Sequence, residues 1–164
     1  QLVSIAILPF TVTVLVPAWV ARANRIAFVA PRSAVDYALC AGGLAVFGIG
    51  LALFGSSLFL FWTRGRGTLA PWDPPRVFVA EGPYRYVRNP MYVAVVTAIV
   101  GQALWFGQPV LLGYAALVWA VVAAFVRWYE EPNLTRRFGD DYRAYRAAVP
   151  GWIPRLRPWD PRSR

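Results

Sequence analysis

The sequence predicts an all-α, polytopic membrane protein with about four transmembrane helices. Three long stretches contain no charged residue, namely residues 1–21, 37–63 and 89–126. Hydrophobic residues make up 58% of the 164 positions and charged residues only 15%, whereas soluble domains are about half apolar and a quarter charged. A soluble domain of this size rarely tolerates three such stretches, but the hydrocarbon core of a bilayer requires them. We therefore expect residues 1–164 to form a single integral-membrane domain.

Residues 1–62 are predicted to form two N-terminal spans. The first, residues 2–20, contains Pro9 and Pro17, so we expect a kinked helix whose freed carbonyls are bonded by neighbours. It lacks the basic start and cleavage site of a signal peptide, which favours a span. The second, about residues 34–62, is roughly 43 Å long as a helix and must tilt or project from the bilayer. Small residues permit close helix contact, which we expect at Gly42, Gly43, Gly48, Gly50 and Gly55.

Two further spans are predicted from residue 91 to about 106 and from residue 110 to about 127. Gly107-Gln108-Pro109 separates them and is typical of a tight turn. A single bent helix or a re-entrant pair is the alternative, but 36 uncharged residues favour a hairpin of two spans. Beyond Arg127 the chain becomes polar, and residues 132–145 predict a C-terminal amphipathic helix on the cytosolic side. Its apolar positions at helical spacing are Leu134, Phe138, Tyr142 and Tyr145.

The positive charge is distributed as in a membrane protein. The net charge is +9, and all 17 basic residues are Arg. They flank the apolar stretches, which indicates topology signals and contacts with anionic lipid headgroups rather than nucleic-acid binding. Residues 63–90 carry five Arg and the segment from Arg127 onward carries nine. We therefore expect both segments on the cytosolic side of a bacterial inner membrane, although the three Arg of residues 21–33 oppose this orientation.

The residue types available for chemistry are few. The chain has no His and one Cys, Cys40, so we expect no metal site. A dinucleotide-binding G-x-G-x-x-G turn is absent from the sequence. Any reaction must therefore use Asp, Glu, Arg, Tyr, the backbone and a bound cofactor.

Three polar clusters stand beside the apolar stretches. The first is the basic, aromatic segment 82–92, in which Asn89 and Pro90 suit the capped start of a helix. An interfacial collar is one interpretation, and a pocket for a carboxylate and an adenine is the other. The second cluster is Glu130-Glu131, which is either ordinary interfacial charge paired with Arg127 or a binding group for hydroxyls or an ammonium. The third is residues 138–143, where an exposed Asp140–Arg143 pair is routine in a helix.

The order of these clusters resembles a known family. Residues 88–92 read Arg-Asn-Pro-Met-Tyr, residues 130–131 Glu-Glu, residues 138–145 Phe-Gly-Asp-Asp-Tyr-Arg-Ala-Tyr and residues 149–150 Val-Pro. In this order they resemble the integral-membrane methyltransferases related to isoprenylcysteine carboxyl methyltransferase and the phospholipid N-methyltransferases, over about residues 64–158. Asn89 stands where that family most often has His, and Ala94 where Gly is frequent.

The resemblance implies an S-adenosylmethionine-dependent membrane methyltransferase with its cofactor-binding catalytic region in residues 63–164. The acceptor would be a lipidic or small hydrophobic molecule bearing a carboxylate, amine or thiol. Two alternatives are a membrane reductase that uses a nicotinamide cofactor and a non-enzymatic module that binds lipid or a partner. Arg127 and Arg143 are expected to orient the acceptor. The expected cofactor-binding residues are Tyr84, Arg88, Asn89, Pro90, Tyr92, Glu130, Glu131 and Tyr142.

Overall fold

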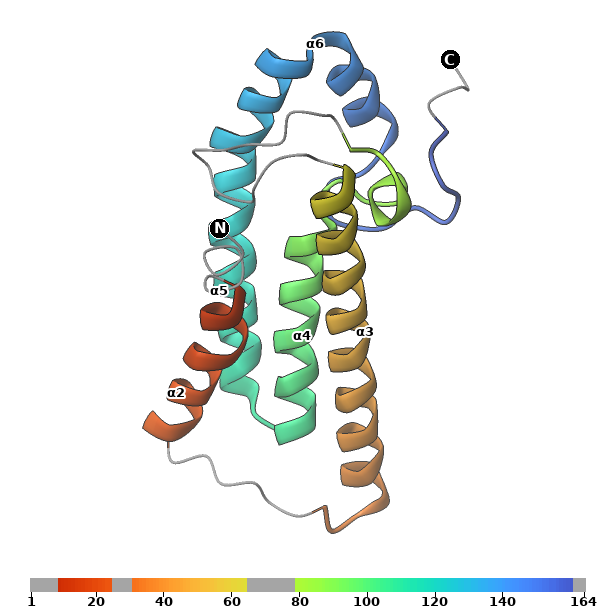
Figure 1. Cartoon of the computed structure of the whole chain (residues 1–164). Coiled ribbons are helices and arrows are strands. Elements are labelled where there is room, and N and C mark those ends of the chain that lie inside the picture. The colour runs from red at the N-terminus through yellow and green to blue at the C-terminus, as the bar shows by residue number, and fades with distance from the viewer. Residues whose placement is uncertain (1–8, 25–30, 65–78, 161–164) are drawn as a thin grey trace. The chain divides into compact units, whose positions relative to one another are not determined.

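The computed structural model describes residues 9–24, 31–64 and 79–160, and this part of the chain contains helices and no strand (Figure 1). In chain order the elements are the π-helix η1 (Thr11–Leu15), α2 (Val16–Ala23), α3 (Ala34–Arg64), the 3-10 turn η2 (Gly82–Arg85), α4 (Pro90–Phe106), α5 (Pro109–Phe125), the π-helix η3 (Val126–Glu130) and α6 (Glu131–Ala148). The all-α prediction is confirmed for these residues.

The chain divides into two compact units. The first contains Gln1–Ala52 and Ala94–Trp119, and the second contains Leu53–Val93 and Ala120–Arg164. The long helices α3, α4 and α5 each contribute residues to both units. Every contact described below lies within one unit, and the single-domain expectation stays a prediction.

The predicted hairpin of residues 91–127 is two helices, α4 and α5, joined at Gly107 and Gln108. Gly107 adopts a φ of +62°, which only glycine accepts readily. The amide of Gln108 donates to the carbonyl of Ala103 at 2.8 Å, and this bond closes the end of α4. The alternative of one bent helix is therefore wrong.

Helix α3 begins where its sequence supplies a cap. The side chain of Asp36 accepts bonds from the amides of Arg32 and Ser33, and the Ser33 hydroxyl accepts one from the Asp36 amide. This reciprocal arrangement satisfies amides that a helix start leaves without partners.

Within the first unit, α3 and α4 lie side by side with their backbones unusually close (Figure 1). A Cβ added to Gly50 would lie 2.8 Å from the Ala98 nitrogen and 2.9 Å from the Ala94 carbonyl oxygen. Gly43 faces the backbone of Trp105, and Gly101 of α4 faces the backbone of Phe47, in the same way. Small residues on both helices thus allow this contact.

The expectation of close contact is wrong for the other three glycines of α3. A Cβ at Gly42, Gly48 or Gly55 would meet nothing within 4 Å. Gly43 and Gly50 are seven residues apart and share one helix face, whereas these three lie on other faces.

The described part of the first predicted span contains a π-helical turn, and the expectation that neighbours bond its freed carbonyls is confirmed. The Val16 amide donates to the carbonyl of Thr11, five residues earlier, just before Pro17. Pro17 has no amide hydrogen, so the Thr13 carbonyl loses its helical donor. Gln102 of α4 donates to that carbonyl at 2.9 Å, and the Tyr114 hydroxyl of α5 donates to the neighbouring Val12 carbonyl at 2.9 Å.

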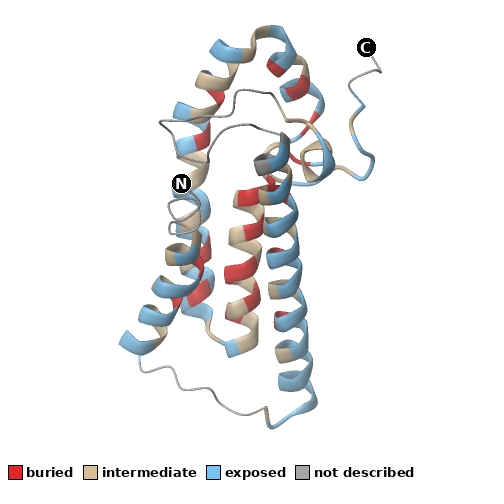
Figure 2. Cartoon of the chain, in the orientation of Figure 1, coloured by how far each residue is buried: buried red, intermediate tan, exposed pale blue. Residues whose placement is uncertain are grey.

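Two helical segments are long and apolar enough to cross a membrane. They are Ala34–Leu60 and the apolar part of the continuous helix Pro109–Ala148, while Thr11–Ala23 and Pro90–Phe106 are apolar but shorter. Much of the surface of α3 and α5 is exposed (Figure 2). The large side chains exposed there include Leu39, Leu44, Ile49, Phe59, Leu117, Trp119 and Val121. Such a surface suits lipid rather than water, and the count of four spans stays a prediction.

The α3–α4 contact predicts opposite effects of alanine at two neighbouring glycines. Gly50→Ala forces a methyl group against backbone atoms and should lower the free energy of unfolding by about 1–3 kcal/mol, the usual cost of overpacking. Gly48→Ala adds a methyl group in open space and should leave stability unchanged or slightly higher. Thermal unfolding in detergent, followed by circular dichroism, measures both, and equal melting temperatures would contradict the close contact.

Candidate functional site

The segment 82–89 is held by the C-terminal part of the chain within the second unit. The Arg88 amide donates to the Pro150 carbonyl at 2.9 Å, and the amides of Arg155 and Trp159 donate to Tyr86 and Arg85 at 3.0 and 2.9 Å. The Tyr145 hydroxyl donates to the Tyr84 carbonyl at 2.6 Å. Residues far apart in the sequence thus fix the backbone of this turn.

Local sequence explains the shape of the turn. Gly82 has a φ of +52° and Pro83 follows it, which starts the short 3-10 turn η2. Asn89 precedes α4, and its carbonyl accepts the Val93 amide as the first helical bond. Its side-chain nitrogen donates to the Gly151 carbonyl at 3.1 Å, so this side chain ties the helix start to the C-terminal segment.

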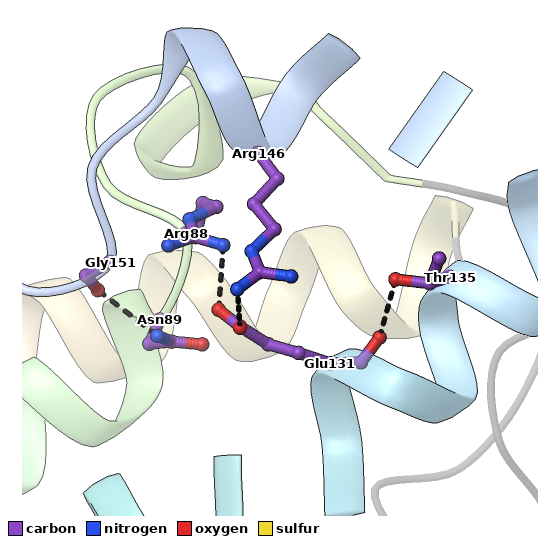
Figure 3. Close-up of polar contacts among 6 residues, drawn as sticks. All are labelled: Arg88, Asn89, Glu131, Thr135, Arg146 and Gly151. Atoms are coloured by element: carbon purple, nitrogen blue, oxygen red, sulfur yellow. Dashed lines mark hydrogen bonds and ion pairs between the residues drawn. The ribbon is translucent and has the colours of Figure 1, made fainter. Parts of the chain in front are cut away.

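Glu131 is a buried carboxylate with two cationic partners (Figure 3). Its Oε1 lies 2.6 Å from Arg88 Nη1, and its Oε2 lies 3.0 Å from Arg146 Nη2. Only 8% of the side chain is exposed. A buried carboxylate is costly without paired charges, and the two arginines supply them. The ion pairs also connect both ends of α6 to the turn.

The neighbouring Glu130 is in a different environment. The Tyr92 hydroxyl of α4 donates to its Oε2 at 3.1 Å, and the carboxylate lies close enough to act electrostatically on Tyr84. Burial and this negative charge raise the pKa of Tyr84, whose phenol therefore stays protonated at neutral pH. Among the described residues no cation forms an ion pair with Glu130. Burial therefore raises the pKa of this carboxyl above its usual value, although the Tyr92 hydrogen bond opposes that shift.

A π-helical turn directs the two carboxylates. In η3 the Glu131 amide donates to the Val126 carbonyl, five residues earlier, and Pro132 follows immediately. The wide turn places an extra residue in the helix just before proline, as η1 does before Pro17. Such turns rotate the residues that follow, and they recur at functional sites.

Helix α6 contains a break that the sequence analysis did not predict. Gly139 has φ 54° and ψ −127°, which separates two helical parts. After the break, Tyr142, Tyr145 and Val149 are buried and form a cluster with Ala80, Leu134, Phe138 and Trp159. The break thus lets the apolar residues of both parts pack together, and only glycine adopts this conformation without strain.

The structure brings together eight of the ten predicted site residues. Tyr84, Arg88, Asn89, Pro90, Tyr92, Glu130, Glu131 and Tyr142 all lie in or beside the turn and the start of α6 within the second unit. Arg127 and Arg143 are exposed, and Arg143 pairs with Asp140 at 2.5 Å. The ion pair that the sequence suggested between Arg127 and Glu131 is wrong, since Arg88 and Arg146 occupy that carboxylate.

Sequence reasoning missed three participants, namely Arg146, Gly151 and Trp159. A Cβ at Gly151 would lie 3.2 Å from Arg88 Nη2, so glycine permits the close approach of the C-terminal segment. Arg85 Nε donates to the Trp159 carbonyl at 2.6 Å. No local pattern marks Arg146 or Trp159, whereas the Val-Pro-Gly sequence before Trp152 was a signal that a tight approach follows.

Comparison with known proteins identifies the family. The family model described as phospholipid methyltransferase matches residues 41–141. This chain belongs to that family. It is also similar to the protein-S-isoprenylcysteine O-methyltransferase of Schizosaccharomyces pombe, with 34% identity over 79 residues. That alignment covers 48% of this chain and 33% of the relative, so the chain spans about a third of the relative's length.

The resemblance read from the ordered motifs is thereby confirmed. The two long apolar helices are compatible with a place in the membrane, as expected for such a family. The matched range contains the turn, Tyr92 and both carboxylates, but it ends before Tyr142, Arg146 and the C-terminal segment.

The two carboxylates predict unequal stability effects. Glu131→Gln leaves Arg88 partly buried without its counter-charge, and loss of one partner of a buried pair costs about 3–5 kcal/mol. Glu130→Gln removes a charge that has no ion pair among the described residues, so the free energy of unfolding should change by less than about 1 kcal/mol. Melting of the empty proteins in detergent measures both. Equal losses would contradict the structural role assigned to Glu131.

Proposed function

We propose that this protein transfers a methyl group from S-adenosylmethionine to a lipidic or small hydrophobic acceptor at the membrane face. The observation that carries the proposal is the arrangement of Glu130: it accepts a hydrogen bond from Tyr92, lies near Tyr84 and has no ion pair among the described residues. Family membership supports the reaction class.

The residues present fit such a cofactor. Its sulfonium and ammonium are cationic, and Glu130 offers a carboxylate without a paired cation in the described part of the chain. Arg88 Nε is buried and has no hydrogen-bond partner there, so it is available to a carboxylate. Tyr84 and Tyr92 offer hydroxyl donors and aromatic faces. Pro90 is buried at the first position of α4, directly after Asn89. Tyr142 of α6 lies close to Arg88 and interacts with it.

The cofactor supplies an activated methyl group, so the protein must align the reactants and exclude water. In this proposal Glu130 binds the cofactor, whereas Glu131 acts through Arg88 by holding it in place. An amine acceptor must be neutral before transfer, and Glu130 is the carboxylate that can take its proton. A carboxylate or thiolate acceptor needs no such base. The similarity to an isoprenylcysteine O-methyltransferase supports an acceptor of lipid character.

Arg127 is better placed than Arg143 to orient that acceptor. Arg127 is exposed just after the apolar part of α5, where the polar end of a lipid would approach. Arg143 is engaged with Asp140 in an exposed pair.

We further propose four spans in a bacterial inner membrane, with the site on the cytosolic side. The Arg bias supports this orientation, because residues 63–90 and the segment from Arg127 onward carry 14 of the 17 Arg. Anionic lipid headgroups would then contact these segments.

Cofactor binding tests the central proposal. S-adenosylhomocysteine should raise the melting temperature of the protein in nanodiscs, and a nicotinamide dinucleotide should not. Glu130→Gln should weaken S-adenosylhomocysteine by about 10- to 100-fold, the loss of one charged hydrogen bond of roughly 1.5–3 kcal/mol. Arg143→Gln is the matched control and should leave affinity unchanged, because Arg143 is exposed and pairs only locally. Isothermal titration gives the affinities.

Two outcomes would contradict this proposal. If wild-type protein binds no S-adenosylhomocysteine at millimolar concentration, the cofactor is wrong. If Glu130→Gln binds it as tightly as wild type, then Glu130 is an ordinary interfacial charge and the assigned site is wrong.

The proposed orientation has its own test. In a Cys40→Ser background, a cysteine at Gln108 should react with a membrane-impermeant thiol reagent added outside intact cells. A cysteine at Asp160, exposed in the C-terminal segment, should react only after lysis. The reverse pattern would overturn the orientation while leaving the site chemistry untouched.

A further inference from the structure

Two large apolar side chains of the C-terminal segment 152–158 are exposed on the protein surface. Leu156 is 99% exposed and Ile153 is 79% exposed, three residues apart. Both belong to a well-tethered segment, because the amide of Arg155 between them donates to Tyr86 and its guanidinium donates to Ala148 at 3.0 Å. The fold therefore holds this pair of side chains outward, and neither packs in the described core.

Hydrogen bonds hold this segment beside the N-terminal end of the apolar helix α4. Pro150 accepts the Arg88 amide, and Pro90, two residues later, is the first residue of α4. Helix α4 has no charged residue along its length. If α4 begins at the boundary of the hydrocarbon core, residues 150–156 lie beside the same boundary.

The aromatic residues after α5 are independent evidence for the same boundary. Trp128 is 78% exposed and Tyr129 is 47% exposed, directly after the apolar helix. Exposed Trp and Tyr concentrate at membrane–water interfaces. Glu131, two residues after Tyr129, pairs with Arg88, and the Arg88 amide donates to Pro150. Arg88 therefore connects the end of the aromatic pair's helix to the C-terminal segment within the second unit.

The charge of the segment indicates which kind of surface it would contact. Residues 150–164 carry four Arg and one Asp, and Arg157 is exposed beside Leu156. Arg155 is held by the fold, which leaves Arg157 to meet a partner. Exposed apolar groups beside Arg are the composition of segments that insert shallowly among anionic headgroups.

We propose that residues 152–158 are an interfacial anchor, in which Ile153 and Leu156 insert into the headgroup region and Arg157 binds the phosphate of an anionic phospholipid. This inference rests on the position of α4 at the interface and not on the methyl-transfer reaction. It assigns to the C-terminal segment a task beyond holding the 82–89 turn.

The test uses the whole protein in nanodiscs, with the native cysteine replaced by serine. Leu156→Cys carries an environment-sensitive nitrobenzoxadiazole probe, and Asp140→Cys, whose parent side chain is 92% exposed, carries the matched control. In discs of phosphatidylcholine and phosphatidylglycerol, the probe at 156 should shift to the blue and be quenched by shallow spin-labelled lipid. The control probe should be quenched by aqueous iodide instead.

A second comparison isolates the charge. Arg157→Gln should lower the anionic-lipid preference of the probe at 156 about fivefold, the effect of one Arg at an anionic surface. Arg136→Gln, at an exposed position of α6, should not. Iodide quenching at 156 equal to that of the control would overturn the anchor. So would a blue shift without lipid quenching, which would show that protein or a second copy covers the segment. Binding of S-adenosylhomocysteine should persist in all these variants, so failure of the anchor is distinct from failure of the proposed function.

Discussion

The ion pairs of Glu131 are the interaction on which the site depends. One buried carboxylate joins Arg88 of the turn before α4 and Arg146 near the end of α6. The desolvation of these groups is costly, and it is offset only while all of them stay together. The same Arg88 donates its amide to Pro150. The ion pairs thus join the turn to both ends of α6, and backbone hydrogen bonds and the apolar cluster of Tyr142, Tyr145 and Val149 hold the C-terminal segment beside them.

This arrangement separates the roles of two adjacent carboxylates. Glu131 is neutralised by its arginines and contributes structure. Glu130 lies near two tyrosines and has no ion pair among the described residues, which supports the proposal that it binds a cationic ligand. A π-helical turn lies just before Glu131 and Pro132. A second π-helical turn, η1, lies before Pro17, and there Gln102 and Tyr114 donate hydrogen bonds to the freed carbonyls.

The other helices contain few polar groups, and their packing depends on small residues and a few specific hydrogen bonds. Gly43 and Gly50 of α3 and Gly101 of α4 allow backbone contact, while large apolar side chains turn outward toward the proposed lipid. Polar side chains in the apolar helices serve specific bonds, as Gln102 does. The C-terminal segment, which has no regular secondary structure, combines backbone bonds to the turn with outward Ile153 and Leu156. A short chain thus assembles its site and its proposed contact with lipid headgroups from the same residues.

The sequence by itself determined the all-helical class, the course of the long helices and the family. The uncharged stretches predicted α3, α4 and α5, because a bilayer would exclude charge from helices that cross it. The ordered motifs predicted the family, which the match over residues 41–141 confirms. The tertiary structure decided which carboxylate is neutralised, because Arg88 and Arg146 lie 43 residues before and 15 residues after Glu131 and local spacing had favoured Arg127. It also decided the break at Gly139 and the approach of Gly151, since backbone conformation and long-range contact depend on what the folded chain brings together.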